Sequence, residues 1–243
     1  MRGAAFDSEP DRLRSLAEHY RRIELSNAIG ADLTIAITEE EKHALLEEDP
    51  GLVVDVVPNV HRICTMVAPA SSRRDLFFIG GFQHTPNVDA VLFFVQNILP
   101  LVHAQQSDIR FNIVGSDMPD SIHALASPLV NPVGYVPDVA SWFENSRVFV
   151  SPLRHGAGMK GKIGQSLSYG LPVVTTHVGA EGMGLVDGVD ALIADDPTAF
   201  ANAVLRLYTD DVLWHRVSAA GQDLIAQRYS KDAVSPILMS LLA

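Results

Sequence analysis

The chain has 243 residues, of which 47% are hydrophobic, so it can bury the core of one large α/β domain or of one domain with an appendage. Its formal net charge of −11 argues against binding of nucleic acid, and an anionic ligand would need a local cluster of Lys and Arg. The single cysteine, Cys64, excludes an internal disulfide and gives no sign of a metal cluster, so no bound metal is expected.

No apolar run approaches the length of a bilayer-spanning segment. The first residues also lack the apolar stretch of a secretory signal. We therefore expect a cytoplasmic protein, either free or peripheral at the inner face of the membrane.

Short β-branched runs alternate with amphipathic helices, which is typical of an α/β fold with a doubly wound parallel sheet. In the first part of the chain the pattern predicts a helix at 10–29, a strand at 32–37, a short helix after Thr38 and a strand at 53–57. Thr38 and Glu41 have the spacing of a capping box, in which the hydroxyl and the carboxylate accept from free amides at the helix start. The periodicity lapses between Val60 and Arg74, as in a linker.

A complete doubly wound domain is predicted after the lapse. Strands are expected at 76–79, 110–114, 131–133, 148–151 and 173–176, and helices at 88–104, 120–126, 139–144, 162–169 and 197–209. Two further helices are expected at 211–228 and 231–242. In such a sheet, ligands bind beyond the carboxyl ends of the strands, so the loops at those ends are the candidate site.

The most informative loop runs from Ser151 to Gln165, where a strand ends, glycines follow and a helix begins. It brings Arg154, Lys160 and Lys162 together in a chain that is acidic overall. Backbone amides, the helix dipole and these cations together suit a diphosphate. The alternative interpretation is a solvated basic turn.

Two other sets of strand-end residues add weaker signals. Gly80 and Gly81 would let backbone amides approach a phosphate just before a helix start, although a tight turn has the same pattern. Gly115 is a permissive strand end, and main-chain groups of 135–137 could bond the edge of a base.

Gly156, Gly158 and Gly161 also spell the G-x-G-x-x-G fingerprint of dinucleotide-binding proteins. That fingerprint expects an acidic residue at the end of the next strand, which here ends in Thr175-Thr176. An NAD-dependent oxidoreductase is therefore a less favoured alternative.

The segment Gln165–Thr176, QSLSYGLPVVTT, resembles the EAMACGLPVVAT signature of family 4 glycosyltransferases. Stretches at 31–39 and 57–60, and the strand ends near 79, 114, 133 and 148, resemble further motifs of that family in the same order. The resemblance implies the C-terminal half of a GT-B fold. In that fold two Rossmann-like domains face a cleft, with the nucleotide sugar on the second domain and the acceptor largely on the first.

The resemblance also implies a domain organisation. We expect residues 1–60 to be a remnant of the N-terminal acceptor-side domain and 61–74 to be a linker. Residues 75–229 would form the nucleotide-sugar-binding domain, and 230–243 a helix that crosses back onto the first domain.

The implied activity is transfer of a hexosyl group from a nucleoside-diphosphate sugar to a hydroxyl of a saccharide or lipid-linked acceptor, with retention of configuration and without a cofactor. A non-catalytic nucleotide-sugar-binding module, or one part of a split enzyme, is the alternative. Partners would then be a second copy of the chain or a separate N-terminal domain. The sequence names neither the base nor the sugar.

Site roles follow from the same resemblance, although no catalytic residue is identified. The expected ligands are Gly80, Gly81, Gly158, Met159, Lys160 and Lys162 for the diphosphate, Gly156, Ala157 and Gly158 for the sugar, Gln165 for the ribose, and Gly115, Tyr135, Val136 and Pro137 for the base. The two glutamates of the family's E-x7-E motif fall on Ala157 and Gln165. The charge that they carry elsewhere in the family is therefore missing here.

Overall fold

A computed structural model describes residues 9–156 and 158–241, and the chain divides into two compact units, 1–58 and 59–243. The described part of the first unit contains α1 (Glu9–Ile29), β1 (Thr34–Ala36), α2 (Glu39–Glu48) and β2 (Val54–Val56). Strands β1 and β2 pair in parallel around the α2 crossover.

The predicted capping box opens α2. Thr38 Oγ1 accepts from the Glu41 amide at 3.1 Å, and the Glu41 carboxylate accepts from the Ile37 amide at 3.0 Å. The return bond therefore reaches one residue further back than the usual pattern, and it still satisfies an amide at the helix entry.

The second unit contains a parallel sheet of six strands in the order β5-β4-β3-β6-β7-β8. The strands are β3 (Arg74–Ile79), β4 (Phe111–Val114), β5 (Val130–Gly134), β6 (Ser146–Ser151), β7 (Val173–Thr175) and β8 (Leu192–Ile193). This is the doubly wound order, in which the chain first builds outward in one direction and then in the other. The reversal, or switch point, lies between β3 and β6.

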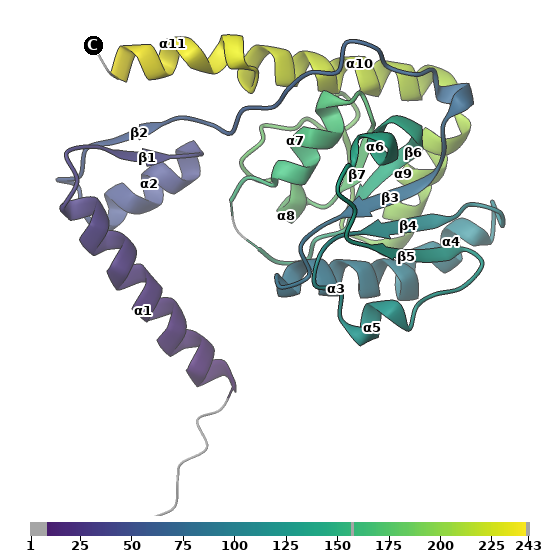
Figure 1. The fold of residues 1–243 in the computed structure, drawn as a ribbon, viewed down its shortest axis with the longest axis horizontal. Coiled ribbons are helices and arrows are strands. Elements are labelled where there is room, and N and C mark those ends of the chain that lie inside the picture. The colour runs from purple at the N-terminus through teal and green to yellow at the C-terminus, as the bar shows by residue number, and fades with distance from the viewer. Residues whose placement is uncertain (1–8, 157, 242–243) are drawn as a thin grey trace, which may run out of the picture. The chain divides into compact units, whose positions relative to one another are not determined.

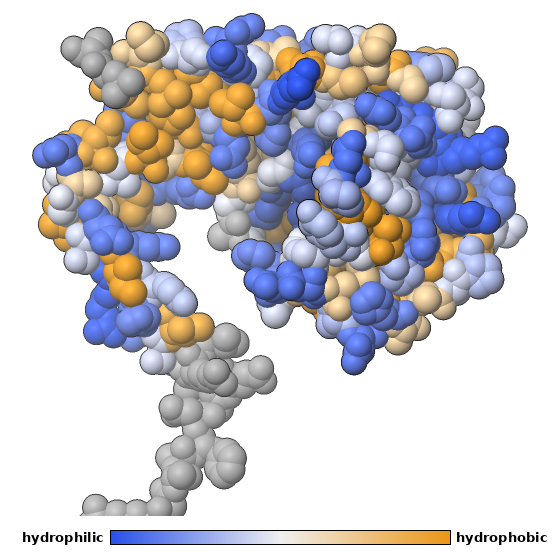
Figure 2. Space-filling model, in the orientation of Figure 1, coloured by the Kyte–Doolittle hydropathy of each residue, from blue (hydrophilic) through white to orange (hydrophobic). Residues whose placement is uncertain are grey.

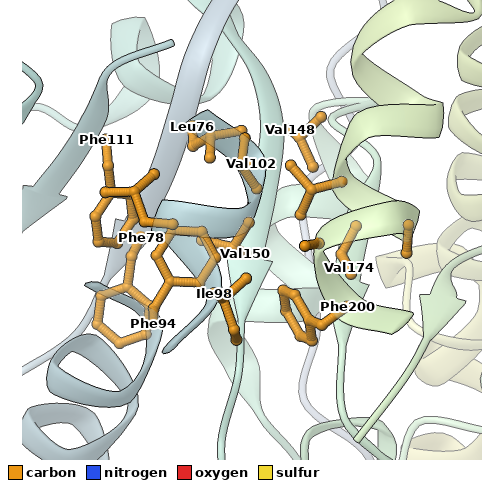
Figure 3. Close-up of a cluster of buried hydrophobic side chains, with 14 of the residues drawn as sticks. Leu76, Phe78, Phe94, Ile98, Val102, Phe111, Val148, Val150, Val174 and Phe200 are labelled. Atoms are coloured by element: carbon orange, nitrogen blue, oxygen red, sulfur yellow. The ribbon is translucent and has the colours of Figure 1, made fainter. Parts of the chain in front are cut away.

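Helices cover both faces of this sheet (Figure 1). The helices of the second unit are α3 (Thr85–Phe93), α4 (Leu99–His103), α5 (Asp120–His123), α6 (Ala140–Asn145), α7 (Gly161–Ser168), α8 (His177–Ala180), α9 (Pro197–Thr209), α10 (Asp211–Arg228) and α11 (Lys231–Leu241), with a short 3-10 turn at Ala70–Ser72. Of these, α11 continues beyond α10 and extends past the sheet (Figure 1). On one face, Phe78 of β3 joins a buried cluster with Phe94 and Phe200 (Figure 3). On the other face, Phe77 meets the ring of Phe143, with centroids 5.0 Å apart. Because alternate residues of a strand point to opposite faces, one strand serves both cores.

The single helix predicted at 88–104 is three segments in the structure. It begins at Thr85 and widens into a π-helical segment, Phe94–Ile98, before α4. Pro100 explains the break, because its ring has no N–H to donate and clashes with the carbonyl four residues earlier.

The combined stretch Thr85–His103 is long and apolar enough to cross a membrane, which the sequence analysis did not anticipate. Most of its apolar side chains pack in or against the core of the second unit, where Ala90, Phe94 and Ile98 are fully buried. Its composition is therefore explained by its place inside a doubly wound domain.

The segment 61–74, predicted as a linker, lies along the second unit. The Cys64 amide donates to the Ser168 carbonyl at 2.9 Å, and the Gln222 side chain donates to the Cys64 carbonyl at 2.9 Å. The His61 amide donates to the Tyr229 carbonyl at 2.7 Å. These bonds fix the segment against α7 and the end of α10.

Candidate functional site

A cavity of about 320 Å³ opens at the switch point, beyond the carboxyl ends of β3, β4 and β5. Its wall consists of Ile79, Gly80, Gly81, Asn87, Val114, Gly115, Ser116, Tyr135, Val136, Val139, Lys162 and Gln165. Loops that are far apart in the sequence therefore meet at the edge where doubly wound sheets bind ligands.

Glycines at the strand ends make the floor of this cavity. The Gly80 amide donates to the Val114 carbonyl at 3.1 Å, and the Gly115 amide donates to the Gly134 carbonyl at 2.9 Å. A Cβ at Gly115 would lie 1.8 Å from the Gly80 carbonyl oxygen, so no larger residue fits there. The close approach of these strand ends leaves main-chain groups as the surface that faces the cavity.

Lys162 brings a cation into the cavity. Its ammonium group donates to Oδ1 of Asn87 and lies 4.5 Å from the ring centroid of Phe78. Burial lowers the pKa of Lys162 to about 7, and the nearby charge of Lys160 makes a smaller contribution in the same direction. Within the described part of the chain, no carboxylate lies within ion-pair distance of this ammonium group. No counterion among these residues therefore cancels the charge of Lys162.

Lys160 is held differently. Its ammonium group donates to the carbonyl oxygens of Gly156 and Gly158, and it lies 3.6 Å from a carboxylate oxygen of Glu181. Gly156 and Gly158 have φ angles of +120° and +74°, which side chains rarely allow. Lys160 therefore stabilises the glycine loop itself and shares its charge with Glu181.

Arg154 does not join the other two cations, contrary to the expectation that all three converge. Its guanidinium forms two hydrogen bonds to the carboxylate of Asp89 and covers the ring of Phe93 at 4.5 Å. The sequence could not show this, because Asp89 lies 65 positions earlier in the chain.

The two helices that begin at the switch point have no side-chain cap. His84 precedes α3 and Lys160 precedes α7, and neither side chain accepts from the helix amides. In contrast, the side chains of Asp196 and Asp210 cap α9 and α10. The positive ends of α3 and α7 are thus left for a ligand of negative charge.

The cavity gathers most of the residues predicted for the base and the ribose. Gly115, Tyr135 and Val136 line it. Pro137 does not line it, and the next residue of the wall along the chain is Val139. Tyr135 is an exposed residue at the rim of the cavity. Gln165 lines the cavity and also a second hollow of about 580 Å³ beside residues 60–65.

The remaining predicted ligands lie in the loop before α7 and do not line the cavity. These are Gly156, Gly158, Met159 and Lys160. Met159 is buried, with 9% of the residue exposed. Ala157 lies outside the described residues. The roles of these residues stay predictions.

Asn87, for which no ligand role was predicted, lies in the cavity wall. An Asn near a helix start usually indicates a helix cap, so the sequence pattern did not suggest that Asn87 lines a ligand cavity. Its position six residues after a glycine pair at a strand end was the available signal. No group of three metal-ligating side chains is found within the described residues.

The fold and the place of this cavity define a doubly wound α/β domain. The sequence profile of the glycosyl transferases group 1 family matches residues 73–210. The chain belongs to this family, which confirms the resemblance seen in the sequence.

Two relatives show the same kinship over part of their length. The chain is 28% identical over 131 residues to the lipopolysaccharide core biosynthesis glycosyltransferase LpsE of Rhizobium meliloti. The matched region covers 51% of this chain and 38% of LpsE. The chain is 23% identical over 141 residues to a 44.6 kDa protein in the cps region of Klebsiella pneumoniae, which covers 54% of this chain and 36% of that protein. The match spans well under half of either relative.

Solved structures share the fold at low sequence identity. TarM of S. aureus superposes with a TM-score of 0.75 at 18% identity, over 91% of this chain and 45% of TarM. HepE of Anabaena, solved with UDP and glucose, superposes with a TM-score of 0.72 at 14% identity, over 93% of this chain and 68% of HepE. The chain has the fold of the C-terminal half of a GT-B glycosyltransferase.

Proposed function

We propose that this chain binds the UDP-sugar donor of a GT-B glycosyltransferase that transfers a hexosyl group to a hydroxyl of a saccharide or lipid-linked acceptor. The observation that carries the proposal is the ammonium group of Lys162 in a cavity at the switch point, with no carboxylate of the described residues within ion-pair distance. A buried charge is costly unless a counterion arrives, so this cavity favours an anion.

The donor parts can be assigned along the cavity wall. The base would lie against the main chain of Tyr135 and Val136, and the ribose beside Gln165 on α7. The diphosphate would lie between the Gly80-Gly81 peptide groups and Lys162, at the open ends of α3 and α7. The sugar would then extend toward the glycine loop before α7.

Chemistry at this site depends on the leaving group. When the bond between the anomeric carbon and the diphosphate oxygen breaks, negative charge grows on the diphosphate. Amides and a cation that are already in place stabilise that charge without reorganisation. We propose that Lys162 supplies this positive charge without a bound metal and that the sugar keeps its anomeric configuration.

UDP is the proposed nucleotide because HepE and TarM, which share the fold, were solved with UDP. Calorimetry with UDP, GDP, ADP and uridine, each with and without EDTA, tests the assignment. We expect UDP to bind at least tenfold more tightly than uridine, and EDTA to leave the affinity unchanged. Equal affinities for UDP and uridine would remove the diphosphate from the proposed function.

A second candidate function is a donor-binding module whose transfer activity requires another polypeptide. The GtfA/B complex, with a TM-score of 0.63 at 17% identity over 90% of this chain and 46% of that chain, is a fold relative that assembles with a partner. Hydrophobic side chains also gather on the surface where α11 lies (Figure 2), and Ile237, Leu238 and Met239 are 38–68% exposed. That face suits a second copy of the chain or a separate acceptor-side domain.

Transfer assays separate the two candidates. The purified chain would be incubated with several UDP-sugars and a sugar or lipid acceptor, and the glycosylated acceptor would be measured. Light scattering would measure the molar mass of the chain in solution. Binding of UDP without transfer supports the module. Multiple turnovers by a monomer would show that the chain completes an active site alone.

A further inference from the structure

The side chain of Asn87 links the two sides of the switch point. It lies in the first turn of α3, with 8% of the residue exposed. Its Nδ2 donates to the Gly81 carbonyl at 2.7 Å, and its Oδ1 accepts from the ammonium group of Lys162. The amide therefore connects the loop after β3 to the start of α7.

The Gly81 carbonyl decides which way this amide faces. A carbonyl can only accept, so it must face the NH2 end of Asn87, and the oxygen end is then directed at Lys162. The amide also fills the space beside Gly80, where an added Cβ would lie 2.8 Å from the amide carbon of Asn87. The orientation of the amide is thus set before any ligand binds.

The neutrality of the amide matters as much as its position. Arg154 is paired with the carboxylate of Asp89, and Lys160 lies beside that of Glu181. Lys162 is the member of this trio whose side-chain partner is an uncharged amide. An amide oxygen fixes an ammonium group without cancelling its charge, whereas a carboxylate would act as an internal competitor of an incoming diphosphate.

We propose that Asn87 is a positioning residue that holds the ammonium group of Lys162 in the cavity wall with its charge available to the diphosphate of the donor. This inference rests on the proposed function. It assigns to Asn87 a role that acts through Lys162 and not through contact with the base or ribose.

A double-mutant cycle tests the proposal, with UDP and uridine as the probes in calorimetry. Asn87→Ala should weaken UDP binding about tenfold and leave uridine binding within about twofold. In the background of Lys162→Met, the same change should cost less than about twofold, because the group that it positions is gone. An equal loss in both backgrounds, or a parallel loss for uridine, would show that Asn87 only supports the fold.

Asn87→Asp is the second variant, because it keeps the shape of the side chain and adds a counterion for Lys162. It also removes the donor to the Gly81 carbonyl, as Asn87→Ala does, so the comparison of the two variants isolates the added charge. We expect Asn87→Asp to weaken UDP binding at least as much as Asn87→Ala, with uridine binding retained. Undiminished UDP binding by this variant would overturn the role of neutrality. If wild type itself does not prefer UDP to uridine, the proposed function fails; if it does and Asn87→Ala binds UDP normally, only this inference fails.

Discussion

Arg154 and Asp89 form a two-bond ion pair that ties the loop after β6 to α3, with Nε of Arg154 donating to Oδ2 of Asp89 at 2.9 Å. The hydrogen bonds from Arg154 also lower the pKa of Asp89. This pair stands next to the candidate site and satisfies its own charge. Arg154, like Lys160, thus has a carboxylate beside it, whereas the side-chain partner of Lys162 is the uncharged amide of Asn87.

Arg154→Met is accordingly expected to leave UDP affinity within about twofold of wild type. The Arg154 side chain is 51% exposed, so the pair should contribute only about 0.2–1 kcal/mol to the free energy of unfolding. That contribution is present above the unfolded pKa of Asp89, 3.8, and is lost as the pH falls through the lowered folded value. Calorimetry and denaturant unfolding measure the two quantities. A tenfold loss of UDP affinity would return Arg154 to the diphosphate site.

Lys162→Met should have the opposite profile. Loss of a charge-assisted hydrogen bond to the diphosphate is expected to cost about 1.5–3 kcal/mol of UDP binding. The stability of the folded chain should not fall, because the folded pKa of Lys162, about 7, lies below the ordinary 10.5 and the buried ammonium group opposes folding. Between these two values the wild type should gain stability as the pH rises, and the variant should lose this dependence. Unchanged UDP affinity would mean that another group binds the diphosphate.

The sequence predicted most of the second unit because parallel strands are buried on both faces. All six residues of β6 are buried, and such runs stand out between amphipathic helices. The bounds of α9 and α10 were predicted correctly, since Asp196 and Asp210 cap them. The two-residue strand β8 and the four-residue helix α8 were missed, because tertiary pairing defines elements this short.

The candidate site was less predictable than the fold. Strand-end glycines such as Gly80 and Gly115 could be found from the topology alone. The sequence could not distinguish Lys160, Lys162 and Arg154, because their partners Glu181, Asn87 and Asp89 come from other loops and helices. Those partners decide which of the three charges remains available.

Binding of UDP should take up protons at pH 8. About one in ten Lys162 side chains is charged there if the pKa is about 7, and a diphosphate beside it would raise that pKa. UDP is fully ionised at pH 8, so the uptake would report the protein. Calorimetry at pH 8 in two buffers of different ionisation enthalpy measures it, with Lys162→Met as the control. Equal uptake by the wild type and the variant would assign the proton to another group.

Gly81 and Gly80 provide a matched pair that separates ligand space from packing. A Cβ at Gly81 has Ser116 Oγ at 3.8 Å as its nearest neighbour, so Gly81→Ala should fold with an unchanged melting temperature. It should nevertheless weaken UDP binding, because the methyl group stands where a phosphate would approach the main chain. Gly80→Ala should lower the melting temperature as well, since its Cβ meets the Asn87 amide at 2.8 Å. Undiminished UDP binding by Gly81→Ala would place the diphosphate elsewhere.

Gln165→Glu restores the residue type of the family signature at the position predicted to hold the ribose. Gln165 lines the cavity from α7, one turn beyond Lys162. A carboxylate accepts hydrogen bonds from two hydroxyls more strongly than an amide, so uridine should bind about as well as in wild type or up to about fivefold more tightly. UDP should still bind, and the ratio of UDP to uridine affinity reports whether the new charge reaches Lys162. A large loss of uridine binding would show that Gln165 donates through its amide nitrogen, and that the ribose role of this residue requires an amide in this chain.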